Sequence, residues 1–353
     1  MAGCSRDART SLQRIKGDSD RLAESLLATV AGCWKTQAIG TFAELEIADH
    51  LGSGPLAVDR LAEFVGCAGD PLHRLLRACV ALELVIETAQ GEYELTETGR
   101  LLSASSPNSV RKWTLWWSKE LYSTFRELSY SVRTGQSARQ KLYGTSGFAH
   151  LEQNPELASL FHGGLAEVTR IAASDIVRSF DFSRFSKVID VGGGFGQLLA
   201  AILDRNPYVS GILFDLPATI EQVPRDLGNT ALQGRVEFVS GDFFREIPTG
   251  TDAVVLKSVI HDWPRDDALR ILANCRSSIR QGAKLLLIER LAPTVLADDE
   301  SSRAIAQRDL TMLVAHGAQE RSEDEYRELL TASGFEVASV TTTQSGFSIL
   351  EAI

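Results

Sequence analysis

The part of the sequence after Ser186 predicts an α/β fold built on a mostly parallel, doubly wound sheet with helices on both faces. Short apolar runs alternate there with stretches of helical spacing, which is typical of repeated strand–helix–strand units. Two further apolar segments, at 335–340 and 346–352, bring the expected sheet to seven strands in one C-terminal domain. The five earlier runs are KVIDVG, GILFDL, RVEFVSGD, DAVVLKS and KLLLIER.

The residues before this domain predict a mostly helical arrangement. The first twenty residues are polar, and we expect them to form a poorly ordered tail. Apolar residues at helical spacing over 21–51 predict two helices with a break near Gly40. The Pro and Gly that bound 55–66 predict another helix, and Asp70 is positioned to cap the next one with Pro71 at its first position.

A short strand after these helices completes a winged-helix pattern, which invites comparison with DNA-binding modules. Tyr93 and Leu95 alternate with polar neighbours in this strand. The charges oppose DNA binding, because residues 55–100 hold four basic and eight acidic side chains, and the resulting net charge of −4 repels phosphate. A helical packing or dimerisation module is the simpler interpretation.

The whole chain of 353 residues is acidic, with 36 Lys plus Arg against 46 Asp plus Glu and a net charge of −10. This balance argues against nucleic acid or anionic lipid as a partner. The length suggests two or three domains. No stretch approaches the ~20 apolar residues of a membrane span, and the N-terminal segment lacks the apolar core of a signal peptide. The five cysteines include no C-x-x-C pair, so we expect no metal site and a reducing, cytoplasmic setting.

The segment 106–180 predicts helices with clustered aromatic side chains. Trp113, Trp116 and Trp117 lie close together, and Phe125, Phe148 and Phe161 follow at helical spacing. Aromatic residues in such a pattern usually pack in a core. The alternative is that some of them line a flat apolar pocket for an aromatic ligand.

The strongest local motif is the run VIDVGGGFG at 188–196, in which a strand is followed by a glycine-dense turn that opens a helix. Glycines let the backbone adopt positive φ and approach a ligand closely. The end of the first strand is where doubly wound folds bind nucleotides. Asp215 ends the second strand, 19 residues after Gly196, and a carboxylate there can accept both ribose hydroxyls. Together, turn and carboxylate predict a nucleoside-binding site.

The spacing of the glycines indicates which nucleoside cofactor this is. A dinucleotide fingerprint would need a glycine at Gln197, whereas this chain has G-x-G-x-G. Asp190 just ahead of the turn disfavours a pyrophosphate and suits a ligand with an ammonium or sulfonium group, and S-adenosylmethionine carries both. We expect Asp242 to accept the adenine amino group and Phe243 to lie against the ring. Lys257 ends the fourth strand and is expected to pair with the methionine carboxylate, although it could also be a plain surface lysine.

His261 is the candidate catalytic group, because it is one of six histidines and falls just after the fourth strand at the ligand edge of the sheet. Two carboxylates can orient it: Glu289 at the end of the fifth strand and Glu320 in the loop GAQER. Their structural alternatives are a solvated strand end and a helix cap or ion pair. Asp262 and Trp263 are expected to fix the loop that follows His261.

The ordered set DVGGGFG, FDLP, GDFF, LKSVIHDW, LLLIER and GAQERSEDEYRELL resembles the class I S-adenosylmethionine-dependent O-methyltransferases of the caffeate/hydroxyindole type, which include bacterial enzymes of antibiotic and pigment biosynthesis. The resemblance runs from about residue 20 to the end. It implies a winged-helix-like dimerisation domain, a Rossmann-like catalytic domain and an intertwined homodimer, which would also bury the apolar faces of the N-terminal helices. The domains implied are a tail at 1–20, a dimerisation domain at 21–105, a pocket-lining helical linker at 106–180 and a catalytic domain at 181–353.

The resemblance also implies roles for individual residues. The general base is His261, supported by Glu289 and Glu320. The residues expected to bind S-adenosylmethionine are Asp190, Gly192, Gly194, Asp215, Leu216, Asp242, Phe243 and Lys257. The residues expected to line the acceptor pocket are Phe161, Leu165, Asp262, Met312 and His316.

The predicted activity is methyl transfer to a hydroxyl group on a small aromatic or polyketide-like metabolite. A histidine base suits a hydroxyl of high pKa, so we expect a phenolic group. Three alternatives stay open at this point. Some relatives use the same cofactor for hydroxylation, decarboxylation or pericyclic chemistry. The acceptor atom could be nitrogen or carbon, and the chain could be a regulator that senses a metabolite.

Overall fold

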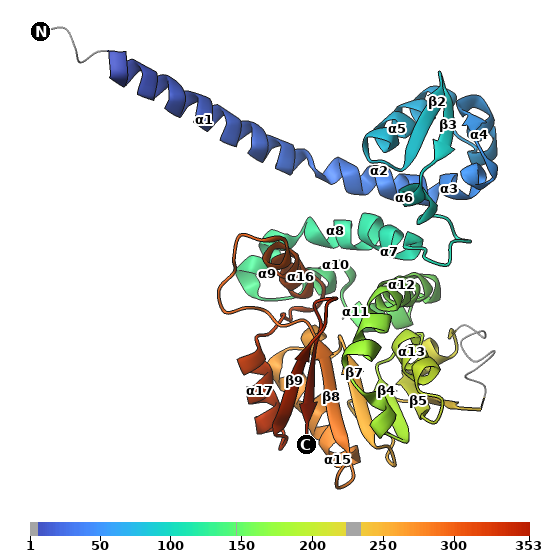
Figure 1. Cartoon of the computed structure of the whole chain (residues 1–353), viewed down its shortest axis with the longest axis vertical. Coiled ribbons are helices and arrows are strands. Elements are labelled where there is room, and N and C mark those ends of the chain that lie inside the picture. The colour runs from blue at the N-terminus through green and yellow to red at the C-terminus, as the bar shows by residue number, and fades with distance from the viewer. Residues whose placement is uncertain (1–5, 146, 224–233) are drawn as a thin grey trace, which may run out of the picture. The chain divides into compact units, whose positions relative to one another are not determined.

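A computed structural model describes residues 6–145, 147–223 and 234–353 of the chain. Contacts between residues divide it into two compact units, 1–118 and 119–353, which are described separately (Figure 1). The helices between residues 119 and 179 thus belong with the sheet of the second unit. The division at residues 20, 105 and 180 stays a prediction.

The first unit begins with helices whose boundaries differ from those expected. The first helix starts at Arg6, so most of the segment expected to be a disordered tail is helical. The break between the first two helices falls at Gly32, whereas Gly40 lies inside the second helix and packs against Ser118. A glycine is required at this position because any side chain would overlap that of Ser118. The helices are α1 (Arg6–Ala31), α2 (Cys33–Glu44), α3 (Ile47–His50), α4 (Val58–Val65), α5 (Gly69–Ala81), α6 (Glu97–Arg100) and α7 (Arg111–Trp116), with η1 at Leu51–Ser53.

A small antiparallel sheet accompanies these helices. In the described part of the unit it has the order β1-β3-β2, formed by Leu56–Ala57, Glu92–Leu95 and Val85–Ala89. The strand expected around Tyr93 is present, and its partner β2 was not predicted. The expected cap at Asp70 is wrong: α5 begins at Gly69 after Ala68, and no side chain caps it.

The helices at the start of the second unit lead up to the sheet. The longest of them, α12 (Pro155–Ser179), begins with a proline, which fits the first turn because a residue there needs no N–H partner within the helix. The predicted helical character of this region is confirmed. The remaining elements are η2 (Trp117–Leu121, a π-helix turn), α8 (Tyr122–Phe125), α9 (Leu128–Thr134), α10 (Ala138–Tyr143) and α11 (Gly147–Glu152).

Among the described residues of the second unit, seven strands form one sheet in the order β6-β5-β4-β7-β8-β10-β9. The pairs from β6 to β8 are parallel, and β10 runs antiparallel to both β8 and β9. This confirms the predicted mostly parallel seven-stranded sheet. The strands are β4 (Lys187–Val191), β5 (Ser210–Asp215), β6 (Val236–Ser240), β7 (Ala253–Lys257), β8 (Lys284–Glu289), β9 (Val337–Thr342) and β10 (Ser348–Ala352).

Apolar clusters cover both faces of this sheet. Ile189 of β4 packs in the cluster that includes α15 (Arg265–Ser278) and α17 (Glu323–Ala332). Its neighbour Val188 packs in the cluster that includes α12 and α13 (Gln197–Arg205). Both side chains are fully buried, as expected for a strand between two helical layers. Figure 1 shows the helices and strands of this unit. The helices and turns along the sheet are η3 (Phe182–Arg184), α13 (Gln197–Arg205), α14 (Pro217–Ile220), η5 (Ile260–Asp262), α15 (Arg265–Ser278), α16 (Glu300–His316) and α17 (Glu323–Ala332).

Within residues 6–145, 147–223 and 234–353, none of the helices combines the length and the hydropathy that a membrane span requires. The cytoplasmic location expected from the sequence stays a prediction.

Gly99 in α6 offers a test of packing in the first unit. A Cβ at this position would overlap the carbonyl oxygen of Leu84 and lie 2.7 Å from Cδ1 of Leu95. We therefore expect Gly99→Ala to destabilise the chain by about 1–3 kcal/mol, as overpacked cores do. The matched control is Gly52→Ala, where a Cβ meets nothing within 4 Å. Thermal denaturation of both variants checks this, and equal melting temperatures would contradict it.

Candidate active site

The glycine turn after β4 has the geometry of a backbone cradle. Gly192, Gly194 and Gly196 all have positive φ (68°, 57° and 77°), which L-residues with side chains rarely adopt. The N–H of Gly194 donates to Oδ2 of Asp215 at 2.8 Å, and the N–H of Leu216 donates to Oδ1 at 2.7 Å. Asp215 therefore ties the turn to the end of β5. This is why the turn and this carboxylate face the same space.

Asp190 lies behind the turn instead of in the space above it. Its side chain is only 2 % exposed, and a Cβ on Gly193 would come within 2.8 Å of its carboxyl group. Burial raises the pKa of Asp190 to about 7, against the opposing charge of Lys257. Asp190 therefore cannot touch a ligand at the turn in this structure, and it acts on such a ligand only through its charge.

A cavity of about 260 Å³ opens next to the turn. At one end, here called the glycine end, the lining consists of the turn and the residues that follow β5 and β6. At the other end, here called the aromatic end, it consists of side chains from α11, of Ala158, Phe161 and Leu165 on α12, and of Asp262 and Trp263. The lining residues predicted from the sequence are Phe161, Leu165, Gly192, Gly194, Asp215, Leu216, Asp242, Phe243 and Asp262. Those predicted but not among the lining residues are Asp190, Lys257, His261, Glu289, Met312, His316 and Glu320.

Aromatic rings make up much of the aromatic end. Phe148 stacks on Trp263 with a centroid distance of 5.3 Å and meets Phe161 edge-on at 6.3 Å. Trp263 in turn contacts Phe243 at 5.9 Å. Such a surface suits a flat apolar ligand, which was the less favoured of the two interpretations of the aromatic residues in 106–180.

Lys257 leaves the end of β7 toward α12. Its Nζ donates to Oγ1 of Thr169 at 3.1 Å and lies 5.0 Å from the centroid of Phe347. Burial lowers the pKa of Lys257 to about 8, and the nearby charges of Glu289 and Asp190 limit the effect. Lys257 is therefore still mostly a cation at neutral pH, held between the sheet and α12.

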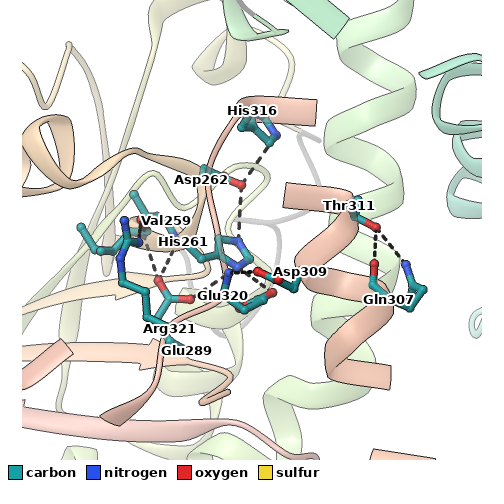
Figure 2. A network of polar contacts seen from close by, with 11 residues as sticks. Val259, His261, Asp262, Glu289, Gln307, Asp309, Thr311, His316, Glu320 and Arg321 are labelled. Atoms are coloured by element: carbon teal, nitrogen blue, oxygen red, sulfur yellow. Dashed lines mark hydrogen bonds and ion pairs between the residues drawn. The ribbon is translucent and has the colours of Figure 1, made fainter. Parts of the chain in front are cut away.

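His261 lies in a cluster of carboxyl groups at the ends of neighbouring strands. Three carboxylates of the described chain come within 4 Å of its ring: Nδ1 is 3.1 Å from Oε1 of Glu320 and 3.8 Å from Oε2 of Glu289, and Nε2 is 3.5 Å from Oδ1 of Asp262. Figure 2 shows the imidazole between these groups. The arrangement fixes both ring nitrogens toward acceptors.

The sheet explains why these residues meet. Strands β7 and β8 are parallel neighbours, so η5, which follows β7, comes to lie beside Glu289 at the end of β8. Oε1 of Glu289 accepts hydrogen bonds from the N–H groups of Val259 and Ile260 at 3.2 and 2.9 Å. Glu320 arrives from a distant loop, which is joined to the end of β8 by a parallel bridge between Leu291 and Arg321.

The carboxylates of Glu289, Asp262 and Glu320 determine the protonation state of His261. Burial favours the neutral ring, but the charges of Glu289, Asp262 and Glu320 outweigh it and raise the pKa of His261 to about 10. Burial raises the pKa of Glu289 to about 7 and that of Asp262 to about 6, with His261 opposing both shifts. The ring therefore carries a proton at neutral pH in the free protein, and it must lose that proton before it can act as a base.

Two residues that support this cluster were not predicted. Arg321 donates from Nη1 to the carbonyl of Ile260 at 2.8 Å and from Nη2 to the carbonyl of Trp263 at 2.6 Å, so it holds the loop around His261. Asp309 accepts the N–H of Glu320 at 2.9 Å. Arg321 directly follows Glu320 in the sequence, but nothing in the local pattern says that its side chain turns back to η5.

His316 was predicted to line the acceptor pocket, and it lies behind the lining residues. Its Nε2 is 3.6 Å from the same Oδ1 of Asp262 that faces His261, and its ring stacks on Phe148 at 5.0 Å. Burial holds the pKa of His316 well below its usual range, and the positive charges of Arg139 and His261 act in the same direction. His316 thus supports Asp262 and Phe148, which do line the cavity.

Family models match both units of this chain. Residues 125–336 match the O-methyltransferase domain, and residues 27–105 match the O-methyltransferase dimerisation domain. The chain belongs to the O-methyltransferase family. The predicted family, fold class and enzyme class, an S-adenosylmethionine-dependent O-methyltransferase, are thereby confirmed.

Named relatives cover nearly the whole of this O-methyltransferase. The phenazine O-methyltransferase PhzM of Lysobacter antibioticus is 37 % identical over 331 residues, which cover 94 % of this chain and 96 % of the relative. The crystal structure of LaPhzM matches with a TM-score of 0.90 at 36 % identity and covers 94 % of this chain and 98 % of its own. NcsB1, an O-methyltransferase from neocarzinostatin biosynthesis solved with S-adenosylmethionine and 2-hydroxy-5-methyl naphthoic acid, matches with a TM-score of 0.77 at 33 % identity and covers 90 % and 95 %.

Proposed function

We propose that this O-methyltransferase transfers the methyl group of S-adenosylmethionine to a hydroxyl group on a small, flat aromatic metabolite, with His261 as the general base. The observation that carries the proposal is the imidazole set among Glu289, Glu320 and Asp262 beside a cavity with a glycine end and an aromatic end. The chemistry named for the relatives, on phenazines and naphthoates, has the same character.

The residues at the glycine end suit S-adenosylmethionine. Gly192 and Gly194 offer close backbone approach, and Asp215 offers carboxylate oxygens to a ribose. Asp242 and Phe243 provide an acceptor and an apolar ring for adenine, with Leu216 beside them. When bound, the cofactor supplies an electrophilic methyl group on a sulfonium.

Charge at this end also fits the cofactor. The cation of Lys257 suits a carboxylate, and the negative charge of Asp190 behind the turn suits a positively charged sulfonium. The pKa of Asp190 is raised to about 7, so part of that charge is lost at neutral pH in the free protein.

The acceptor would lie at the aromatic end. Phe148, Phe161 and Trp263 offer flat apolar surfaces, and Leu165 and Asp262 line the same space. Asp262 brings a carboxylate to this surface, close to His261. Met312 and His316, like His261, are not among the residues that line the cavity. The ring of His261 would reach the acceptor hydroxyl beside Asp262, which does line the cavity and whose Oδ1 lies 3.5 Å from Nε2.

The raised pKa of His261 is close to the pKa of the phenolic hydroxyl whose proton it must accept. A phenol has a pKa of about 10, and an ordinary imidazole at about 6.5 would accept its proton at a cost of about 5 kcal/mol. With a pKa of about 10 for His261, that cost falls close to zero. Neutral imidazole with phenol and imidazolium with phenolate then have similar free energies, and either places a nucleophilic oxygen beside the ring.

Loss of the base tests this proposal. We expect His261→Ala to lower the rate of methyl transfer by about 10²- to 10⁴-fold, as loss of a general base does. Its affinity for S-adenosylhomocysteine should be unchanged, because His261 does not line the glycine end. His50→Ala in the first unit is the control. Mass spectrometry of the methylated product and calorimetry of binding give the two readouts, and an unchanged turnover in His261→Ala would sink the assignment.

We further propose that the chain works as a homodimer through its first unit. Side chains of residues 19–31 in α1 are exposed in the single chain, among them Leu22, Leu26, Leu27 and Val30 at 73, 64, 67 and 70 %. An apolar stripe of this kind is typical of a surface that another chain covers. The match of residues 27–105 to the dimerisation domain supports the same interpretation.

Light scattering tests the dimer. The expected mass is twice the chain mass of 38.5 kDa. A variant with Leu26→Glu and Leu27→Glu should shift toward the single-chain mass, because charges would then be buried in the interface. Val132→Glu is the matched control, since Val132 is 65 % exposed on α9 in the other unit. A single-chain mass for the unaltered protein would refute the proposal.

A further inference from the structure

His162 of α12 lines the cavity, and neither the sequence motifs nor the proposed mechanism gives it a role. Its Nε2 lies 3.2 Å from Oγ1 of Thr219, which follows β5 in α14. Its Nδ1 has no hydrogen-bond partner within the described part of the chain. A hydrogen-bonding atom is thus left without a partner on the wall of a cavity.

The position of the ring relates it to the glycine end. A Cβ on Gly194 would lie 3.9 Å from Nδ1 of His162, so this nitrogen faces the turn across a van der Waals gap. Gly194 is also the residue whose N–H donates to Asp215. His162 and Asp215 therefore approach the same glycine and line the same cavity.

We propose that His162 is a further cofactor-binding residue, which hydrogen-bonds through Nδ1 to the ribose of S-adenosylmethionine beside Asp215. The inference rests on the proposed function, because it takes the glycine end as the cofactor site. A ribose carries hydroxyl groups that both donate and accept. Asp215 as a carboxylate can only accept, whereas a neutral imidazole brings one donor and one acceptor.

The surroundings keep this ring in the form that such a role needs. Burial lowers the pKa of His162, and the charge of Asp215 only partly opposes this, so the ring is neutral at neutral pH. A neutral ring does not repel the positively charged sulfonium. The Thr219 hydroxyl can donate to or accept from Nε2, so Nδ1 is free to take either role toward a ligand.

Neighbouring rings hold His162 in place and separate it from the acceptor end. Its ring meets Phe161 edge-on at 5.2 Å and Phe195 at 5.6 Å. Phe195 belongs to the glycine turn, and Phe161 contacts both His162 and Phe148 of the aromatic end. We therefore expect the hydrogen bond to go to the cofactor and not to the acceptor.

Calorimetry with S-adenosylhomocysteine and S-adenosylmethionine tests the proposal on the full chain. His162→Phe keeps an aromatic ring that can pack against Phe161 and Phe195 but loses both nitrogens. We expect it to weaken both ligands by about tenfold, the effect of one lost hydrogen bond, because both ligands carry the same ribose. The KM for the acceptor should not change. His162→Asn, which keeps polar atoms, should recover part of the affinity.

The controls separate this role from a structural one. His50→Phe, on a histidine of the first unit, should leave both affinities unchanged. A merely structural role would lower the melting temperature of the ligand-free protein without changing either dissociation constant, and that result would overturn the proposal. A change confined to the acceptor KM would overturn it as well. If the unaltered chain bound neither ligand, the proposed function would fail too, whereas normal binding by His162→Phe would refute only the role of His162.

Discussion

The active site depends on one electrostatic constraint, the burial of several carboxyl groups around a single imidazole. Buried carboxylates are costly unless a cation or hydrogen-bond donors compensate them. His261 supplies the positive charge, and the N–H groups of Val259 and Ile260 bind Glu289. The result is a ring whose pKa is raised to about 10. His261, which compensates the buried carboxylates in the free protein, thereby also has a pKa close to that of a phenol.

The fold brings the members of this cluster together from distant parts of the sequence. The parallel pairing of β7 and β8 sets η5 beside Glu289, and the bridge between Leu291 and Arg321 brings in the loop that carries Glu320. The same sheet edge carries the glycine turn and Asp215, one and two strands away from β7. The proposed cofactor site and the proposed base are therefore positioned by the same sheet, and the cavity lies along its edge.

Much of this was predictable from the sequence because it depends on local patterns. Apolar runs of strand length predicted the seven-stranded sheet. The ends of these runs predicted which edge of the sheet carries Asp215, His261 and Glu289. The missed features depend on contacts between distant residues. Arg321 turns back to η5, His162 reaches Thr219, and Gly40 fits inside a helix because Ser118 leaves no room for a side chain. Most of the segment expected to be poorly ordered is helical from Arg6, which its polar composition did not indicate.

The pH dependence of kcat/KM for the acceptor tests most directly whether these carboxylates prepare His261 as the base. Below pH 10 the protonated ring facing a neutral phenol is the inactive form, so the rate should rise about tenfold per pH unit from pH 7 and flatten near the pKa of His261, about 10. Glu289→Gln keeps the hydrogen-bond acceptor but removes the charge, so it should move the midpoint to lower pH. The ionisation of the acceptor itself is the same for both proteins. A flat profile between pH 6 and 9, or the same midpoint with and without Glu289, would contradict the account.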